Sequence, residues 1–371
     1  MKTYLVGGAV RDKLLGIEPK EKDWVVVESN QQELLNLGYK QVGKKFPVFL
    51  HPETFEEYAL ARIERKTEAG HKGFKFDTSK SVTLKQDLLR RDLTINAIAE
   101  DHKGILIDPY NGINDLENRL LRHVSDAFSE DPLRVFRVAR FYATLNKYNF
   151  KIHKTTFEAM KEIVNSGEIE LLSRERLWTE LSKSFDTKYS WMFFEALILS
   201  NVAAKYFPEI INNDLLKRKI MYFSKIDIDK DIFLSIAGFS LNFIDLFGFP
   251  KKITDLYFIF NEFSAKFLSL KLDAKDILYF LNALDAFRRP ERLKIFLTQV
   301  KYFIDFHEMR ENNKSEKIYY AVLLDIFNRL HKSLVNKIDY GDLKNKDIKD
   351  IKKKIEDINL SVINLVLREK S

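Results

Sequence analysis

The chain has 371 residues, of which 45% are hydrophobic, so it is long enough for two or three domains with cores of their own. It contains no cysteine, which excludes disulfides, thiolate metal sites and cysteine nucleophiles. Its formal net charge of +7, from 61 basic and 54 acidic residues, favours a polyanionic partner, although lysines that only solvate the surface give the same bias.

The histidines, the apolar runs and the N-terminus argue against further kinds of site and classes of protein. The seven histidines have no metal-ligand spacing, which argues against a zinc site. No apolar run approaches the roughly 18 residues of a membrane span. The chain begins with a strand pattern and not with a signal or transit peptide. We therefore expect a reduced, cytoplasmic protein without a membrane partner.

A glycine pair follows the first predicted strand. The strand predicted over residues 2–6 ends in a short apolar run, Tyr4 to Val6, which leads into Gly7 and Gly8. The spacing of Val10, Leu14 and Leu15 predicts a helix over residues 9–15. Glycines let the backbone approach a ligand, and the free amides of a first helical turn favour an anion such as phosphate. Arg11, one turn into the helix, is suited to a bidentate hold on phosphate.

Two carboxylates precede the next predicted strand, over residues 23–27. Glu21 and Asp23 stand at alternate positions, so both side chains are expected on one face of the strand. Adjacent acids repel each other unless a cation holds them, and hard oxygen ligands suit Mg²⁺. A phosphate cradle beside a magnesium site indicates nucleotidyl transfer, whereas the alternative is a turn followed by a solvated strand edge.

The rest of residues 1–110 alternates between strand and helix patterns. Glu57 belongs to a predicted strand and faces either the metal ions or solvent, because alternation does not choose the face. The glycine- and lysine-rich segment between Arg62 and Leu84 is expected to be a mobile loop. The further predicted strands cover 47–51, 56–61 and 104–107, and the further helices 31–37 and 84–100.

Arg91 and Asp92 interrupt the apolar pattern of the predicted helix 84–100. An Arg-Asp neighbour pair is more often a surface ion pair than part of a site. Downstream, the turn over residues 108–112 is followed by a long stretch in which the strand signals stop from about residue 140. The fold class that this order predicts is α+β, with an N-terminal α/β head followed by an all-α remainder.

A helix is expected to start at residues 130–132, with acids at its positive end. Asp131, Arg134, Arg137 and Arg140 recur every three residues and form one slanting polar stripe on it. The stripe is either a solvated helix face or a face that binds the RNA backbone, or else its first two members, Asp131 and Arg134, form a pair that recognises a base. Asp131 only accepts hydrogen bonds and Arg134 only donates them, a pattern that fits the pairing edges of cytosine and adenine and mismatches guanine and uracil.

These motifs, in this order, resemble the class II CCA-adding enzymes (tRNA nucleotidyltransferases) and the related bacterial poly(A) polymerases, whose heads have a polymerase-β-like nucleotidyltransferase fold. The resemblance covers residues 1 to about 185, including the E-R-K start at Glu64 and the helix expected over residues 171–185. The family has Asp-x-Asp where this chain has Glu21-Lys22-Asp23, which bears on metal preference and rate. The absence of histidine between His153 and His307 implies that the phosphohydrolase module of longer relatives is missing.

The resemblance also implies roles and partners. Glu21 and Asp23 are expected to hold two Mg²⁺ ions as the catalytic residues, and Asp131 and Arg134 to read the base. The substrates would be tRNA, CTP and ATP, and no protein partner is implied. Poly(A) synthesis and a non-catalytic RNA-binding role remain the alternatives. The residues expected to bind the nucleotide are Gly8, Arg11, Arg91, Asp92, Asp131, Arg134, Arg137 and Arg140.

The domain division expected from these patterns has four parts. A nucleotidyltransferase head covers 1–110, a helical neck with base recognition 111–190, a helical body 191–330 and a helical tail 331–371. Within the body, residues 281–292 predict a helix-turn-helix corner at which Arg288, Arg289 and Arg292 either contact RNA phosphate or lie on an ordinary surface.

Overall fold

A seven-stranded mixed sheet forms the core of the N-terminal part of the protein. In the computed structural model, which describes residues 1–42, 48–66, 74–308, 314–336 and 347–369, the strand order is β3-β4-β5-β2-β1-β8-β9. β2 and β5 are parallel, and the other neighbours are antiparallel. The strands are β1 (Lys2–Val6), β2 (Asp23–Val27), β3 (Lys40–Val42), β4 (Val48–Leu50), β5 (Glu57–Leu60), β8 (Ala99–Glu100) and β9 (Leu106–Ile107).

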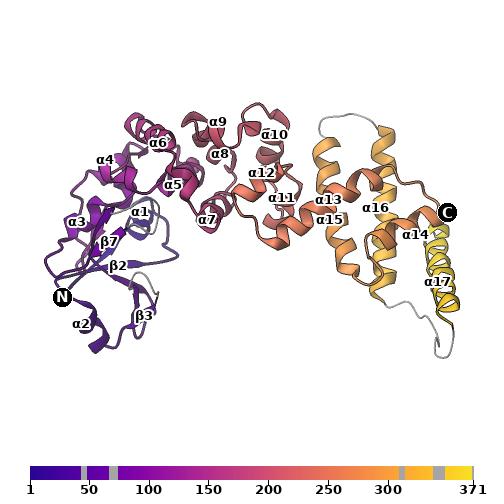
Figure 1. The fold of residues 1–371 in the computed structure, drawn as a ribbon, viewed down its shortest axis with the longest axis horizontal. Coiled ribbons are helices and arrows are strands. Elements are labelled where there is room, and N and C mark those ends of the chain that lie inside the picture. Colours follow the sequence, from indigo (N-terminus) through magenta and orange to yellow (C-terminus); the bar gives the residue numbers. More distant parts are fainter. Residues whose placement is uncertain (43–47, 67–73, 309–313, 337–346, 370–371) are drawn as a thin grey trace. The chain divides into compact units, whose positions relative to one another are not determined.

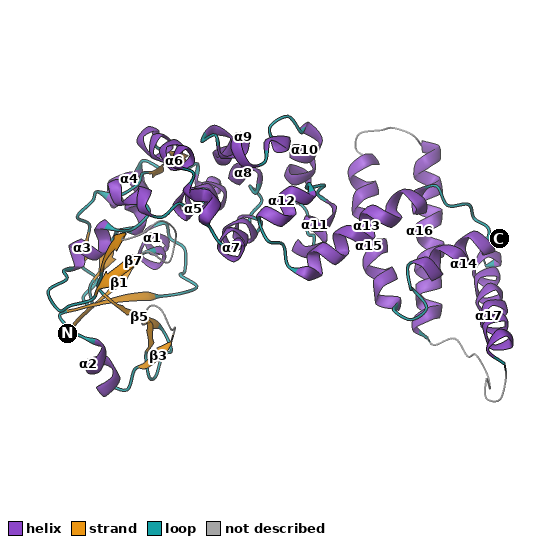
Figure 2. Cartoon of the chain, viewed as in Figure 1, coloured by secondary structure: helices purple, strands orange, loops and turns teal. Residues whose placement is uncertain are grey.

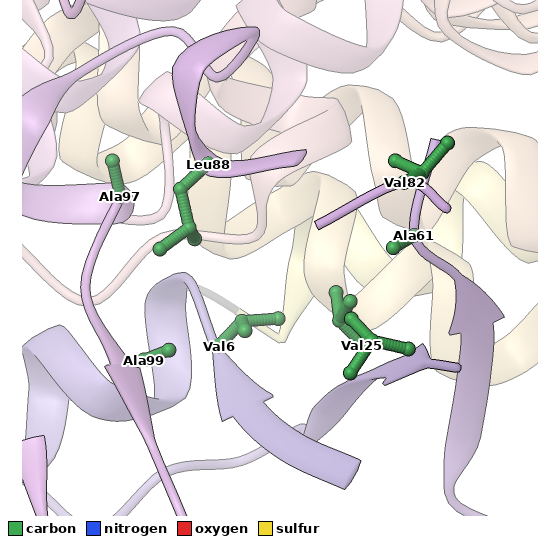
Figure 3. Close-up of a cluster of buried hydrophobic side chains, with 8 residues drawn as sticks. Val6, Val25, Ala61, Val82, Leu88, Ala97 and Ala99 are labelled. Carbon is green, nitrogen blue, oxygen red and sulfur yellow. The ribbon is translucent and has the colours of Figure 1, made fainter. Parts of the chain in front are cut away.

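Four short helices accompany this sheet: α1 (Gly8–Leu14), α2 (Gln31–Asn36), α3 (Leu84–Leu89) and α4 (Gly112–Glu117). Two of them begin with strong caps, since Asn30 accepts from the amide of Glu33, and Thr83 and Gln86 form a reciprocal capping box. Val6, Val25, Leu88 and other buried side chains form an apolar cluster between sheet and helix (Figure 3). This cluster fixes the ends of β1 and β2, where the predicted site residues lie.

Two predictions for residues 62–100 are wrong. The expected helix 84–100 ends at Leu89, after which come a 3-10 turn, Thr94–Asn96, and β8. The helix stops because the following backbone groups bond elsewhere: the amide of Thr94 donates to Arg122 O at 2.8 Å and that of Leu93 to the Asp92 carboxylate at 2.8 Å. The expected loop contains an antiparallel hairpin of β6 (Ile63–Lys66) and β7 (Phe74–Asp77), while residues 67–73 lie outside the described chain.

Helices dominate after residue 110, as Figure 2 shows. The helices up to residue 206 are α5 (Leu133–Thr144), α6 (Lys154–Ser166), α7 (Arg174–Ser184), α8 (Trp191–Leu199) and α9 (Val202–Tyr206), with α5 packed against both α7 and α8. The strand signals do not stop at residue 140, because β10 (Leu120–Leu121) and β11 (Lys151–Ile152) form a parallel pair. These two-residue strands are too short to give a periodic pattern.

The chain divides into two compact units, one of Met1–Lys217 with Asp245–Gly248 and one of Arg218–Ile244 with Phe249–Ser371. The second unit is helical and has a phenylalanine-rich core that includes Phe267, Phe280 and Phe327. The predicted corner at 281–292 is confirmed, since it joins α14 to α15. From residue 214 on, the helices are α10 (Asp214–Phe223), α11 (Lys230–Ile236), α12 (Leu241–Leu246), α13 (Lys251–Leu268), α14 (Ala274–Ala283), α15 (Pro290–Glu308), α16 (Lys314–Val335) and α17 (Ile348–Arg368), as Figure 1 labels them.

None of the helices in the described part of the chain combines the length and the apolar character that crossing a membrane requires. Arg288 and Arg289 lie 4.0 and 3.4 Å from the carboxylate of Asp285 and are exposed, so their predicted contact with RNA phosphate stays a prediction. Of the expected tail, residues 337–346 and 370–371 lie outside the described chain, and the remainder is helical.

Candidate active site

A cleft of about 640 Å³ lies within the first unit and gathers most of the predicted site residues. The ends of β1 and β2, α1, the segment after α3, and helices α5 and α7 contribute to it. Nine arginine and lysine side chains and four carboxylates line it, so it is suited to a polyanion. The charged lining residues are Arg11, Asp23, Glu57, Arg62, Arg90, Arg91, Asp92, Asp131, Arg134, Arg137, Arg140, Arg176 and Lys183.

Asp23 and Asp131 both line this cleft, although they lie 108 positions apart in the sequence. Asp23 is the first residue of β2, and its register partner in the parallel strand β5 is Glu57. Parallel neighbours in register point to the same face of a sheet, so Glu57 lies beside Asp23. Glu21 precedes β2 instead of belonging to it, which corrects the expectation that both acids stand on the strand.

A second pocket of about 540 Å³ adjoins the cleft, and Glu21 lines it together with Asp23 and Glu57. The loss of water around the Asp23 carboxyl raises its pKa; Arg91 opposes the rise and Glu21 adds to it. An oxygen ligand whose charge is poorly compensated by its surroundings is stabilised by a cation. These carboxylates therefore provide a donor set that fits a divalent metal ion.

No three His, Asp or Glu side chains in the described part of the chain form a ready-made metal cage. This does not conflict with a magnesium site, because Mg²⁺ is usually bound by one or two carboxylates and completed by water and substrate phosphates.

A chain of hydrogen bonds links α1 to α5 through Asn96. Arg11 donates to the Asn96 side-chain oxygen at 2.7 Å, and the Asn96 amide donates to Asp92 at 3.0 Å. Asp92 also accepts from Arg137 Nε at 2.7 Å. Burial alone would raise the pKa of Asp92. The nearby Arg137, Asn96 and Arg134 side chains outweigh this effect and hold the pKa of Asp92 well below its ordinary value. Asp92 is therefore ionised at neutral pH and fixes Arg137 in the cleft.

Asp87 performs the same task for the arginines that follow α3. It is fully buried and accepts from Arg90 at 2.7 Å, from Arg91 at 3.2 Å and from the backbone amide of Arg62 at 3.2 Å. Burial acts to raise the pKa of Asp87, but the two guanidinium groups prevail and lower it. Arg91 also packs over Gly7, where a Cβ atom would lie 2.9 Å from its Nη1 and φ is +71°. Because the end of the Arg91 side chain can move, the positive φ is what favours glycine at residue 7.

Glu180 on α7 and Phe141 on α5 organise the remaining arginines. Glu180 is 4% exposed, and its carboxylate accepts from Arg140 and lies 3.6 Å from Arg137. The guanidinium carbons of Arg140, Arg11 and Arg137 lie 4.0, 5.1 and 5.7 Å from the centre of the Phe141 ring. Each of these three arginines also pairs with an acid, namely Asp12, Asp92 or Glu180. The positive charge left for a ligand comes from the lining of the cleft as a whole, in which basic side chains outnumber acidic ones.

The expected base-reading pair is present but engaged within the chain. Asp131 accepts from Arg176 on α7 at 2.7 Å and from the amide of Leu133 at 3.1 Å. Arg134 is 7% exposed and donates to the carbonyl oxygens of Ala127 and Arg90. Both side chains are thus fixed in place before a nucleotide arrives.

Several side chains that shape the cleft have no local signal in the sequence. Asn96, Asp87, Glu180, Arg176 and Phe141 act on residues that lie up to 85 positions away. Asn96 and Asp87 belong to the segment predicted as continuous helix, in which Asn96 would have had an ordinary helical environment. Glu180 and Arg176 occur at helical spacing in α7, where a solvated face is the simpler interpretation.

Two families match this chain. Residues 3–122 match the family described as poly A polymerase head domain, and residues 149–213 match the one described as probable RNA and SrmB-binding site of polymerase A.

Curated relatives are similar over most of the chain. The CCA-adding enzyme of Buchnera aphidicola subsp. Baizongia pistaciae is 42% identical over 341 residues, which cover 79% of this chain and 81% of the relative. That of Coxiella burnetii is 44% identical over 311 residues, or 80% of both chains. A multifunctional CCA protein of Mannheimia succiniciproducens is 55% identical over 210 residues, 57% of this chain and 50% of the relative.

Solved structures share the fold. The Bacillus stearothermophilus CCA-adding enzyme in complex with CTP aligns with a TM-score of 0.67 at 20% identity, covering 98% of this chain and 88% of that one. The Thermotoga maritima CCA-adding enzyme complexed with tRNA aligns with a TM-score of 0.58 at 22% identity, covering 96% and 91%. The predicted fold class, an α/β head followed by helices, is confirmed.

Proposed function

This chain belongs to the CCA-adding enzymes, nucleotidyltransferases that add C, C and A to the 3′ end of tRNA from CTP and ATP, and we propose that the cleft between β2 and α5 is where it does so. The single observation that carries the proposal is that Asp23 and Glu57 share this cleft with Asp131 and Arg134. A site for metal-bound phosphate thus adjoins a pair that matches the pairing edge of C or A.

The family is one that depends on divalent metal, and we propose two Mg²⁺ ions held by Asp23 and Glu21, with Glu57 as a third carboxylate. When bound, such a pair activates the attacking oxygen and neutralises the departing one. The 3′ hydroxyl of the tRNA loses its proton to solvent as its oxygen bonds to the α-phosphorus, the bond from that phosphorus to the oxygen bridging to the β-phosphate breaks, and pyrophosphate leaves. The chain contributes positioning and charge.

The cationic wall of the cleft is proposed to bind the triphosphate. Gly8 and Arg11 stand at the start of α1, and Arg91, Arg137 and Arg140 line the same cleft. Each guanidinium has a hydrogen-bonding acid, amide or carbonyl partner that sets its direction. Because these donors are already oriented, binding of the triphosphate loses little free energy to ordering them.

Asp92 is proposed to contact the ribose as well as to position Arg137. A carboxylate offers about four acceptor positions. Three of them are used by Leu93, Asn96 and Arg137 in the described chain. A ribose hydroxyl can donate to the fourth.

Base selection is assigned to Asp131 and Arg134. An acceptor beside a donor pairs with the amino group and ring nitrogen of cytosine or adenine, and leaves buried mismatches against guanine and uracil. Arg176 supports this reading, because it fixes the Asp131 carboxylate without occupying all of its acceptor positions.

The remaining expectations follow from the same premise. We propose the cytoplasm as the site of action and keep the division into a head (1–110), neck (111–190), body (191–330) and tail (331–371), with the helical parts contacting the tRNA. Poly(A) synthesis and non-catalytic RNA binding stay as the competing functions.

One assay separates the three functions. The protein is given tRNA lacking its 3′ CCA, with Mg²⁺ and with CTP and ATP alone and together, and the products are sized. Addition of two residues from CTP alone and of three from both nucleotides supports CCA addition. An open-ended A tract would indicate a poly(A) polymerase, and binding without extension a non-catalytic relative.

A further inference from the structure

The turn between β4 and β5 exposes a phenylalanine beside the catalytic carboxylates. Phe55 is 71% exposed and has a φ of +58°, a left-handed conformation that is unfavourable for a bulky residue. Among the described residues it is the one apolar side chain in this conformation outside glycine. The others are Glu28, Asn111, Arg119, Asn149, Asn201 and Asp285.

Hydrogen bonds hold this turn in place. The Phe55 amide donates to His51 O at 3.1 Å, and the His51 amide donates to Glu56 O at 3.0 Å. The amides of Glu53 and Thr54 donate to His51 Nδ1 at 3.3 and 3.2 Å. Such a network keeps a conformation that costs free energy, and an unfavourable conformation that is kept points to function.

The place of Phe55 suggests what its ring contacts. It lines the 540 Å³ pocket with Glu21, and Asp23 and Glu57 line both this pocket and the cleft. The two spaces therefore meet at the carboxylates assigned to the metal ions. In an in-line displacement, the attacking oxygen and the leaving pyrophosphate lie on opposite sides of the α-phosphate. If the triphosphate occupies the cationic cleft, the RNA end enters from the pocket that carries Phe55.

We propose that Phe55 is the stacking platform for the terminal base of the tRNA 3′ end; the proposal rests on the function proposed above. The pocket is lined by five carboxylates and two lysines, which disfavours phosphate and leaves the face of a base as the group to be held. Single-stranded RNA ends are commonly held by stacking on aromatic rings. Stacking tolerates any base, as it must when the terminal base changes after each addition.

Three variants at this position test the proposal. Phe55→Leu keeps an apolar side chain without a ring, Phe55→Trp keeps a ring, and Phe55→Gly removes the unfavourable conformation. Loss of one base–aromatic stack predicts a rise in the KM for tRNA of roughly 5- to 150-fold in the Leu and Gly variants. The KM for CTP should not change, the Trp variant should resemble the wild type, and the Gly variant should be at least as stable.

Leu37→Ala is the matched control, since Leu37 is 55% exposed in the same head and lines neither of the two pockets. Its KM for tRNA should equal that of the wild type. Stacking itself is read without turnover by placing 2-aminopurine at the 3′ end of the tRNA and comparing fluorescence quenching in the bound state. Quenching by the wild-type and Trp proteins, with brighter complexes of the Leu and Gly variants, supports the proposal.

Two other results would count against the stacking role or against the proposed function. If the Leu and Trp variants share one KM for tRNA and one degree of quenching, Phe55 is not a stacking platform. If the wild type fails to extend tRNA, the proposed function fails, while the fluorescence comparison still decides whether Phe55 stacks on the RNA end.

Discussion

The substitution Asp92→Asn removes one charge from the cleft while keeping the shape of the side chain. Asp92 is 6% exposed and accepts from Leu93 N, Asn96 Nδ2 and Arg137 Nε at 2.8, 3.0 and 2.7 Å. Asparagine can keep the first two bonds with its oxygen, but its amide then faces the Arg137 donor.

The expected loss of stability follows from that geometry. Removing one partner of a buried ion pair costs about 3–5 kcal/mol. Arg137, however, has a side chain that is 36% exposed and retains Glu180 at 3.6 Å, so water and a second carboxylate replace part of the loss. We expect the free energy of unfolding of the first unit to fall by about 2–3 kcal/mol. The KM for CTP and ATP should rise because Arg137 is no longer fixed.

The measurement is urea unfolding followed by tryptophan fluorescence. All three tryptophans, Trp24, Trp178 and Trp191, lie in the first unit, so the signal reports on that unit alone. Asp245→Asn is the matched control, because Asp245 pairs with Arg174 at the same 2.7 Å while both side chains are more than 60% exposed. It should cost about 0–1 kcal/mol. An equal cost for the two substitutions would refute the argument from burial.

The same variant also has a defined pH dependence. Because the pKa of Asp92 is lowered on folding, its stabilisation is complete above the unfolded-state pKa of about 3.9 and is lost as the pH falls through the folded-state pKa. The difference in free energy of unfolding between the wild type and Asp92→Asn should therefore be constant near neutrality and shrink below about pH 4. A difference that grows on acidification would contradict the sign of the shift.

Three further outcomes are expected. Arg176→Gln frees the Asp131 carboxylate and should lower kcat/KM for CTP and ATP by roughly 5- to 30-fold, with added use of UTP or GTP. Unchanged nucleotide choice in the extension assay would show that Arg176 does not position Asp131 for base selection. Glu21→Asp shortens a proposed metal ligand and should change the rate ratio between Mg²⁺ and Mn²⁺; an unchanged ratio would remove Glu21 from the metal site. Arg91→Gln removes a charge that lowers the pKa of Asp23, so the Asp23 carboxyl should hold its proton to higher pH. The pH below which Mn²⁺ binding is lost should therefore rise, and a fall in that pH would contradict the effect assigned to Arg91.

The elements and residues with a local pattern could be predicted from the sequence. The strands β1 and β2, the glycine turn and helix α5, which carries Arg134, each have a periodicity or turn chemistry confined to a few neighbours. Asp131 was expected on the same helix but precedes it in an extended conformation. The resemblance assigns metal binding to Asp23 and base reading to Asp131, two roles that require one shared site, and both residues do line one cleft.

The helix expected over residues 84–100 shows why other features could not be predicted. Its apolar spacing is compatible with a helix, but Leu93, Thr94 and Asn96 instead bond to Asp92, Arg122 and Arg11, and two of these partners lie far away in the sequence. Tertiary hydrogen bonds therefore override local propensity at the residues that line the site. The partners of the cleft arginines are hidden for the same reason, since burial and distance decide which acid each one meets.

The most direct test of the active site is the comparison of wild-type and Asp23→Asn proteins in extension of tRNA lacking its CCA, with CTP binding measured in parallel. Asparagine keeps the shape of Asp23 but is a much weaker ligand for Mg²⁺. We predict that extension falls by at least about 100-fold, the scale on which loss of a central electrostatic group acts, while the Kd for CTP changes little. Extension within twofold of the wild type would show that the chemistry takes place elsewhere.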